Sequence, residues 1–177
     1  MRTTRYAVLA ALLLTGCAGA MSPTPSGGTT ATAELRDANN QVVGQATFIE
    51  VSGGVRIVLE ARGLPAGEKG VHLHAVGKCA PPEFTSAGAH FNPQNKQHGT
   101  LNASGPHAGD LPNITIAANG TGRLETFTDR VTLGSGPTSL FDDDGTAIVV
   151  HAAPDDFKTD PTGNSGARIA CGVLTKK

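Results

Sequence analysis

The stretch Gly70-Val71-His72-Leu73-His74-Ala75 decides how this 177-residue chain folds around its histidines. Side chains alternate between the two faces of an extended strand, so His72 and His74 would point one way while Val71 and Leu73 point the other. Two imidazoles on one face form a natural pair of ligands for a transition metal. The stretch therefore predicts a strand with one apolar face and one metal-binding face.

A long segment rich in Gly, Pro, Asn and Ser follows Ala75 and carries three of the four remaining histidines. Loops of this length in a compact domain are usually functional or disordered, and metal ligands would hold this one in place. Three imidazoles and one carboxylate make a closed tetrahedral set that suits zinc. The candidate members of that set are His90, His98, His107 and Asp110.

The sixth histidine, His151, directly follows the apolar run 147–150. If Ile148 and Val150 face a core, period-two alternation turns His151 outward, to the side that His72 would share. This alternation places a metal site on the outer wall of the fold, beneath the long loops.

The rest of the pattern is β throughout, and no window favours an amphipathic helix. Turns are expected at Ser52-Gly53-Gly54 and at Asn119-Gly120, each between two apolar runs. The pattern predicts an all-β fold, a Greek-key antiparallel β-barrel or sandwich in which two long loops form the metal site. The expected strands span 31–37, 42–51, 55–61, 70–76, 114–117, 122–127, 147–151 and 168–175.

Residues 1–16 are predicted to be a signal peptide. Arg2 and Arg5 supply its positive start, and the apolar core at 7–14 is too short to span a bilayer. The sequence Leu14-Thr15-Gly16-Cys17 resembles a bacterial lipoprotein cleavage box, which would make Cys17 the acylated first residue of the mature chain. The alternative is an ordinary signal peptide that is cleaved nearby.

Residues 17–30 are predicted to be a lipid-anchored flexible tether, because they are rich in Ser, Thr, Pro, Gly and Ala and carry no charge. Residues 31–177 have the right length for one domain with one core. We therefore expect a protein of the cell envelope, anchored to the membrane through its N-terminal lipid on the periplasmic or the extracellular face.

The charge is nearly balanced, with 14 Lys and Arg against 15 Asp and Glu. The chain has no basic run, one tyrosine and no tryptophan, so nucleic acid is not an expected partner.

Several blocks, together with the strand that carries His72 and His74, resemble the copper/zinc superoxide dismutases, and the resemblance covers residues 31–177. The order and spacing of seven candidate ligands also agree with that family. The matching blocks are Ser86-Ala87-Gly88-Ala89-His90-Phe91-Asn92-Pro93, His107-Ala108-Gly109-Asp110-Leu111, Val149-Val150-His151 and Gly163-Asn164-Ser165-Gly166-Ala167-Arg168-Ile169-Ala170-Cys171-Gly172-Val173.

The resemblance implies one copper and one zinc per chain, joined through His90 as a bridging imidazolate. The implied copper ligands are His72, His74, His90 and His151, and the implied zinc ligands are His90, His98, His107 and Asp110.

The resemblance also assigns roles to residues around the metals. Asp155 would link a copper-ligand histidine to a zinc-ligand histidine, Arg168 would attract and orient the superoxide anion, and Thr162 would narrow the channel. Cys79 and Cys171 match the disulfide of the family, with two free buried thiols as the alternative.

The implied function is dismutation of superoxide to O2 and H2O2 by a redox-cycling copper, with His90 giving a proton to the forming peroxide and zinc holding the loop. Such an enzyme would protect the cell envelope from superoxide. A copper-buffering or copper-delivery module on the same fold is the alternative. Two loops are shorter or rearranged relative to many eukaryotic members, which leaves open whether the chain forms a homodimer.

Overall fold

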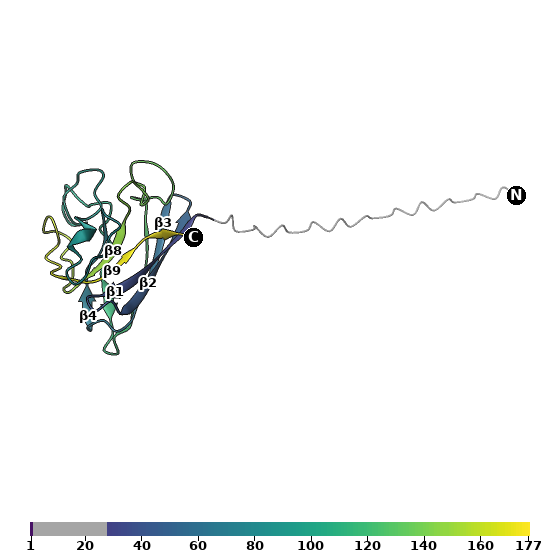
Figure 1. Ribbon diagram of the computed structural model, residues 1–177. Coiled ribbons are helices and arrows are strands. Elements are labelled where there is room, and N and C mark those ends of the chain that lie inside the picture. The colour runs from purple at the N-terminus through teal and green to yellow at the C-terminus, as the bar shows by residue number, and fades with distance from the viewer. Residues whose placement is uncertain (2–27) are drawn as a thin grey trace.

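The computed structural model describes Met1 and residues 28–177, so most of the predicted signal peptide and tether, and Cys17, lie outside the described residues. The described part is built from strands and one short 3-10 turn, η1 (Thr85–Ala87) (Figure 1). The strands are β1 (Thr30–Asp37), β2 (Val42–Val51), β3 (Gly54–Ala61), β4 (Gly67–Lys69), β5 (Val71–His74), β6 (Ile114–Ile116), β7 (Gly122–Thr128), β8 (Ala147–His151), β9 (Arg168–Val173) and β10 (Thr175–Lys176).

These strands form one antiparallel sheet in the order β4-β6-β7-β3-β2-β1-β9-β8-β5, and β10 pairs with β1. The two edge strands, β4 and β5, are consecutive in the chain and are separated only by Gly70, so the sheet curls into a nearly closed barrel. β3 pairs with β7 rather than with β4, and β1 pairs with β9, so long connections cross the ends of the barrel. The predicted all-β Greek-key class is confirmed.

The predicted strand 70–76 is wrong at both ends, because the chain changes partners at Gly70. Residues 67–69 form β4, which pairs with β6, whereas Val71 starts β5, which pairs with β8. A Cβ at Gly70 would stand 2.9 Å from the side chain of Ser165, so the crossing point is too tight for a larger residue. Beyond His74, Ala75 donates its N–H to Ala89 O in the long loop and thereby leaves the sheet.

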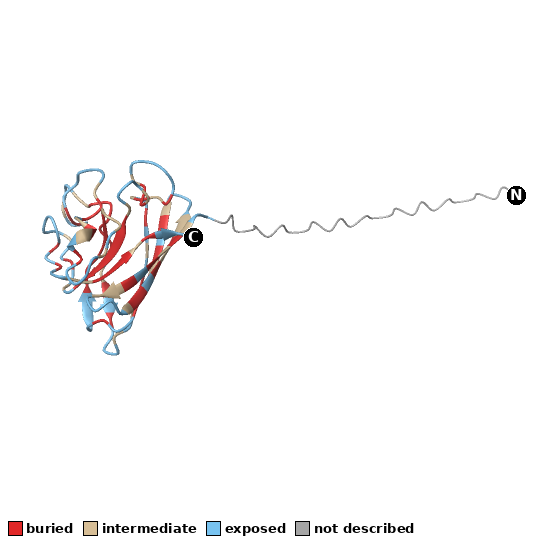
Figure 2. Ribbon diagram, in the orientation of Figure 1, coloured by how far each residue is buried: buried red, intermediate tan, exposed pale blue. Residues whose placement is uncertain are grey.

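Alternation in β5 and β8 separates the main core from a second apolar cluster. Val71 and Leu73 join Ile148 and Val150 in the main core inside the barrel. Ala147 and Val149, which alternate with these two, pack on the opposite side beneath the loop that contains η1. Figure 2 shows the buried strand residues enclosed by exposed loops at the ends of the barrel. The predicted inward face of these two strands is therefore confirmed.

The Cys79–Cys171 disulfide is present, so the implied pairing is confirmed and the free-thiol alternative is wrong. It ties the start of the long loop to β9 across a sequence separation of 92 residues. Within residues 28–177, no helix has the length and apolar character needed to cross a membrane.

We expect the disulfide to contribute strongly to stability, because a crosslink that closes a loop of about 90 residues restricts the unfolded chain by roughly 4–5 kcal/mol. Replacing both Cys79 and Cys171 by Ala should lower the free energy of unfolding of the metal-free protein by about this amount in a denaturant titration. Reduced wild-type protein is the control, since it keeps both sulfur atoms and loses only the link. A loss of less than about 1 kcal/mol in both proteins would contradict this loop-closure account.

Candidate metal centre

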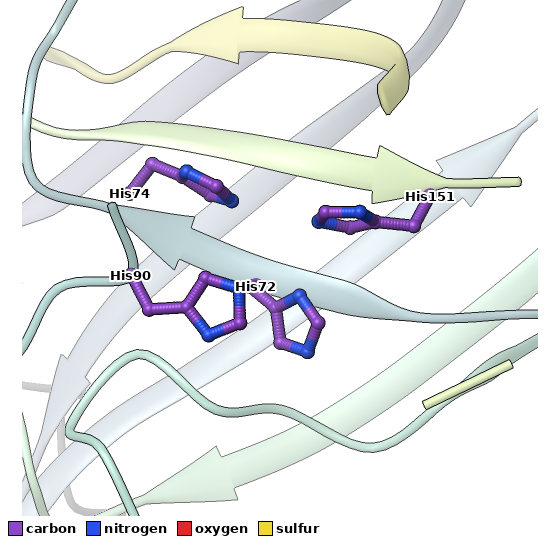
Figure 3. A group of neighbouring side chains, drawn as sticks. All are labelled: His72, His74, His90 and His151. Atoms are coloured by element: carbon purple, nitrogen blue, oxygen red, sulfur yellow. The ribbon is translucent and has the colours of Figure 1, made fainter. Parts of the chain in front are cut away.

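Four histidines meet on the outer wall of the barrel (Figure 3). His72 and His74 project from β5, His151 is the last residue of β8, and His90 comes from the long loop. One ring nitrogen from each lies within 4.8 Å of the others, and all four side chains are buried. An isolated antiparallel bridge between His74 and His90 brings the loop against the strand. We call these four residues the strand-side group.

The inner nitrogens of the strand-side group have no hydrogen-bond partner within the described part of the chain. The atoms are His72 Nδ1, His74 Nε2, His90 Nε2 and His151 Nε2. A buried polar atom without a partner costs about 1–3 kcal/mol, so four such atoms in one place are strongly unfavourable in the absence of a ligand. Convergent imidazole lone pairs are what copper and zinc bind, so the donor set fits a transition metal.

Three outer nitrogens fix the orientation of these rings. His74 Nδ1 lies 2.9 Å from Gly88 O, and His151 Nδ1 lies 3.2 Å from Gly166 O. A carbonyl oxygen can only accept, so both Nδ1 atoms carry the proton and Nε2 keeps its lone pair. His72 instead places Nε2 2.8 Å from Asp155 Oδ2, which leaves its Nδ1 for the centre.

A second group lies on the loop side of His90 and comprises His90, His98, His107 and Asp110. The Nδ1 atoms of the three histidines lie 3.1, 3.1 and 3.2 Å from Asp110 Oδ1. His107 Nδ1 also lies 3.4 Å from His90 Nδ1. Four ligands at about 2.0–2.1 Å from a tetrahedral zinc stand about 3.3 Å apart, so these separations fit zinc. We call these four residues the loop-side group.

His72 also comes within 4.8 Å of His90, His98 and Asp110, but both of its nitrogens are already accounted for. Nε2 is hydrogen-bonded to Asp155, and Nδ1 belongs to the strand-side group. His90 is the residue that the two groups share. Its Nδ1 lies 3.1 Å from Asp110 Oδ1, while its Nε2 is among the unpartnered atoms of the other group. One imidazole ring therefore separates two potential metal positions.

Asp155 joins the two groups behind the rings. Its Oδ2 lies 2.8 Å from His72 Nε2, and its Oδ1 lies 2.9 Å from His98 Nε2. Burial raises the pKa of this carboxyl, but the hydrogen bonds from the two histidines outweigh burial and hold the pKa below its usual range. Asp156 is exposed and caps a turn by accepting the N–H groups of Lys158 and Thr159, so the two neighbouring aspartates have different tasks.

Burial keeps the strand-side histidines neutral at physiological pH. Loss of hydration lowers the pKa of His74 to about 2, that of His151 to about 3 and that of His90 to about 4. Burial also lowers the pKa of His98, but hydrogen bonds to Asp110 and Asp155 outweigh it and raise that pKa to about 9. A metal ligand must be deprotonated at its binding nitrogen. The strand-side histidines can thus bind a cation without losing a proton. His98, by contrast, must lose a proton before its second nitrogen can bind a metal.

Arg168 lies near the strand-side group and is held by two carbonyls of the long loop. It donates from Nη1 to Phe84 O at 2.6 Å and from Nη2 to Gly88 O at 2.7 Å. The same Gly88 oxygen accepts from His74 Nδ1, so the guanidinium and a strand-side imidazole share one anchor.

A surface hollow of about 400 Å³ lies at Arg168. Thr162 is exposed and is not among the residues that line this hollow. The lining residues are Pro82, Glu83, Thr85, Gly166, Ala167 and Arg168.

Sequence reasoning missed two residues that hold this centre together. Asn113 donates from Nδ2 to Asp155 O at 3.1 Å and accepts the Asp155 N–H at 2.9 Å, which fixes the backbone of that aspartate. Asp160 accepts the backbone N–H of His98 across 62 residues of sequence. Neither residue lies in a pattern that indicates a ligand, and both contacts depend on how two loops meet in space.

Comparisons with known proteins agree with this geometry. The family model described as copper/zinc superoxide dismutase (SODC) matches residues 42–174, which is more than half of the chain. Cu-Zn superoxide dismutase 2 of Aquifex aeolicus is 51% identical over 144 residues, which cover 80% of this chain and 84% of that protein. The Cu-Zn superoxide dismutase of Caulobacter vibrioides is 44% identical over 147 residues, 81% of this chain and 84% of its own length.

The fold also has close counterparts among solved structures. The crystal structure of a SOD-like protein from Bacillus subtilis superposes with a TM-score of 0.78 at 37% identity, covering 81% of this chain and 97% of that one. The copper/zinc superoxide dismutases use copper and zinc, and the structure has groups of buried histidines that can hold a metal. On these grounds the chain belongs to the copper/zinc superoxide dismutase family and is an enzyme that dismutes superoxide.

Proposed function

We propose that the strand-side group holds the copper of this enzyme, that the loop-side group holds its zinc, and that His90 bridges the two metals. The observation that carries this proposal is the set of four buried imidazole nitrogens that converge without a hydrogen-bond partner. The separations of 3.1–3.2 Å around Asp110 Oδ1 support zinc at the second position. Opposite nitrogens of His90 face the two positions, which supports the bridge.

The bound copper supplies the one-electron exchange that converts two superoxide ions and two protons into O2 and H2O2. His90 Nε2 faces the copper position, so it can hold a proton whenever that nitrogen is not coordinated and can release it toward the product. His90 Nδ1 faces the loop-side group, and zinc bound there would keep the ring placed while the proton moves.

Arg168 is the residue that we propose to attract and orient superoxide. Arginine remains charged at any working pH, and its planar fork suits a small anion. Two backbone carbonyls fix the guanidinium at the hollow, so the charge is in position before the substrate arrives. A fixed positive charge beside a cleft raises the local concentration of an anionic substrate and its rate of arrival.

We further propose that the enzyme acts in the cell envelope, anchored through a lipid on Cys17, where it protects the envelope from superoxide. The sequence of the cleavage box and the uncharged segment 17–30 support this location. No specific observation favours the alternative of a copper-buffering or copper-delivery module.

The two metal sites should be separable by substitution, because the proposed ligand sets share only His90. His98→Ala should reduce bound zinc well below one per chain while copper stays close to one, and His151→Ala should do the reverse. His90→Ala is the comparison variant and should reduce both metals. Elemental analysis after loading and dialysis measures both contents. Equal loss of both metals in His98→Ala and in His151→Ala would show that the sites are not separate.

Arg168→Ala should preserve the fold and both metals and lower superoxide turnover by about tenfold or more, within the range known for focused electrostatic attraction. Arg168→Glu should lower it further, because a carboxylate repels the anion. Direct kinetics of superoxide decay give the rates, and Arg62→Ala serves as the control because it removes an exposed arginine that does not line the hollow.

Raising the ionic strength to about 1 M, where the Debye length is about 3 Å, should slow the wild type more than Arg168→Ala. Fully metallated wild-type protein that consumes superoxide no faster than free solution chemistry would overturn the assignment of the copper site. Unchanged turnover in Arg168→Ala would overturn only the role of the arginine.

Cys17→Ser should abolish lipid attachment, since a hydroxyl cannot replace the acylated thiol. The wild-type protein should partition into the detergent phase of a membrane extract, and the variant should appear in the aqueous phase or retain its signal peptide. Phase partitioning followed by mass spectrometry of the N-terminus measures both outcomes. Detergent partitioning of the variant equal to that of the wild type would show that Cys17 is not the anchor.

A further inference from the structure

The outer nitrogens of the histidines in the two groups can be accounted for one by one, and a single atom is left over. His72 and His98 direct Nε2 to Asp155, while His74 and His151 direct Nδ1 to backbone carbonyls. His90 turns both of its nitrogens inward. Among the outer nitrogens, only His107 Nε2 takes part in no hydrogen bond within the described chain.

The carboxylate that faces this remaining nitrogen belongs to Asp160. Its Oδ1 lies 3.8 Å from His107 Nε2, and the same oxygen accepts the backbone N–H of His98 at 2.5 Å. One carboxylate from the loop after β8 therefore contacts two members of the loop-side group. The hydrogen bond to the His98 backbone joins residues that are 62 positions apart in the sequence.

The position of Asp160 is fixed by the turn in which it lies. Asp156 accepts hydrogen bonds from the N–H and the hydroxyl of Thr159 and from the side chain of Asn164. This turn is further closed by Gly163 N–H donating to Thr159 O at 2.7 Å. The turn around Asp160 is thereby fixed by bonds that do not involve any histidine, while its carboxylate accepts the His98 N–H.

We propose that Asp160 is a positioning residue for zinc, which holds His98 through its backbone and His107 through its imidazole. This inference rests on the proposed assignment of zinc to the loop-side group. An imidazole that binds through Nδ1 carries its proton on Nε2, and metal-binding histidines almost always donate that proton to a carboxylate, a carbonyl or water. Asp160 supplies the carboxylate that faces His107 Nε2 at 3.8 Å, a charge contact that is longer than the hydrogen bonds of Asp155 with His72 and His98.

The expected loss of zinc affinity depends on how exposed the Asp160 side chain is. Loss of such an outer partner typically lowers metal affinity by about 10-fold to 100-fold. The Asp160 side chain is 44% exposed, whereas that of Asp155 is fully buried. Water screens a half-exposed charge, so we expect the lower end of this range, about tenfold.

The test uses Zn²⁺ alone, added to the metal-free full-length protein in competition with a chromogenic chelator. Asp160→Asn keeps an oxygen that can accept the His98 N–H but removes the charge that faces His107. Asp160→Ala removes both contacts. Zinc affinity should fall about tenfold in Asp160→Asn and further in Asp160→Ala. The absorption bands of Co²⁺ bound in place of zinc should shift in both variants, because the basicity and orientation of His107 change.

Asp142→Asn is the matched control, since Asp142 is also exposed and accepts one backbone N–H, that of Gly145 at 2.9 Å, and its replacement removes the same charge. Affinities of both Asp160 variants equal to that of Asp142→Asn would overturn the proposal. Loss in Asp160→Ala alone would also overturn it, because the bond to the His98 backbone would then be sufficient.

Failure of this inference about Asp160 can be distinguished from failure of the proposed function. Superoxide turnover of the copper-loaded and zinc-loaded wild type tests the copper assignment and does not depend on Asp160. Wild-type protein that binds no Zn²⁺ would overturn the zinc assignment itself. Tight wild-type zinc binding that is insensitive to Asp160 would overturn only the present inference.

Discussion

The carboxylate of Asp155 accepts hydrogen bonds from His72 and from His98, and the arrangement of both histidine groups depends on this pair of bonds. His72 belongs to a strand of the barrel wall and His98 to a loop, so the carboxylate fixes this loop to the barrel wall. The bonds also decide which ring nitrogens remain free. His72 can offer Nδ1, and His98 can offer Nδ1, because Nε2 of each is already engaged.

This carboxylate requires close packing of two loops, the one between β5 and β6 and the one between β8 and β9. Gly163 lies beside it with φ of 63°, and a Cβ at that position would stand 1.9 Å from Asp155 Oδ1 and 2.5 Å from His98 Nε2. Any larger residue there would displace the carboxylate or the imidazole, in addition to straining a left-handed backbone. Asn113, from the loop that also carries His98, fixes the backbone of Asp155. The barrel supplies a rigid wall, and side chains from loops complete the centre.

The centre is costly for the protein without metals. It buries four unpartnered imidazole nitrogens on one side of His90 and a carboxylate with several histidines on the other. Burial of such polar atoms opposes folding, and the fold tolerates this because the main core, the continuous antiparallel sheet and the Cys79–Cys171 link lie elsewhere. A bound cation would use the same nitrogens as ligands, so metal binding and stability are expected to be coupled.

The sequence by itself determined the features that repeat along a strand or lie within one block. Alternation placed His72 and His74 on the face opposite Val71 and Leu73, and the apolar run before His151 gave the strand 147–151 with its bounds correct. The family resemblance, carried by local motifs, named the disulfide partners and the residues that the structure gathers around His90. The predicted strand faces and the predicted disulfide are confirmed, because strand periodicity and motif spacing are properties of neighbouring residues.

Only the tertiary structure decided where separate loops meet. The division of residues 67–74 into two edge strands depends on the closing of the barrel at Gly70, which no local pattern reveals. The contacts of Asn113 with Asp155 and of Asp160 with His98 and His107 join residues 42 to 62 positions apart, in segments without periodicity. An asparagine or an aspartate in a turn is ordinary in sequence. Its role in a metal centre arises because the fold places its side chain against a particular ring nitrogen or backbone group.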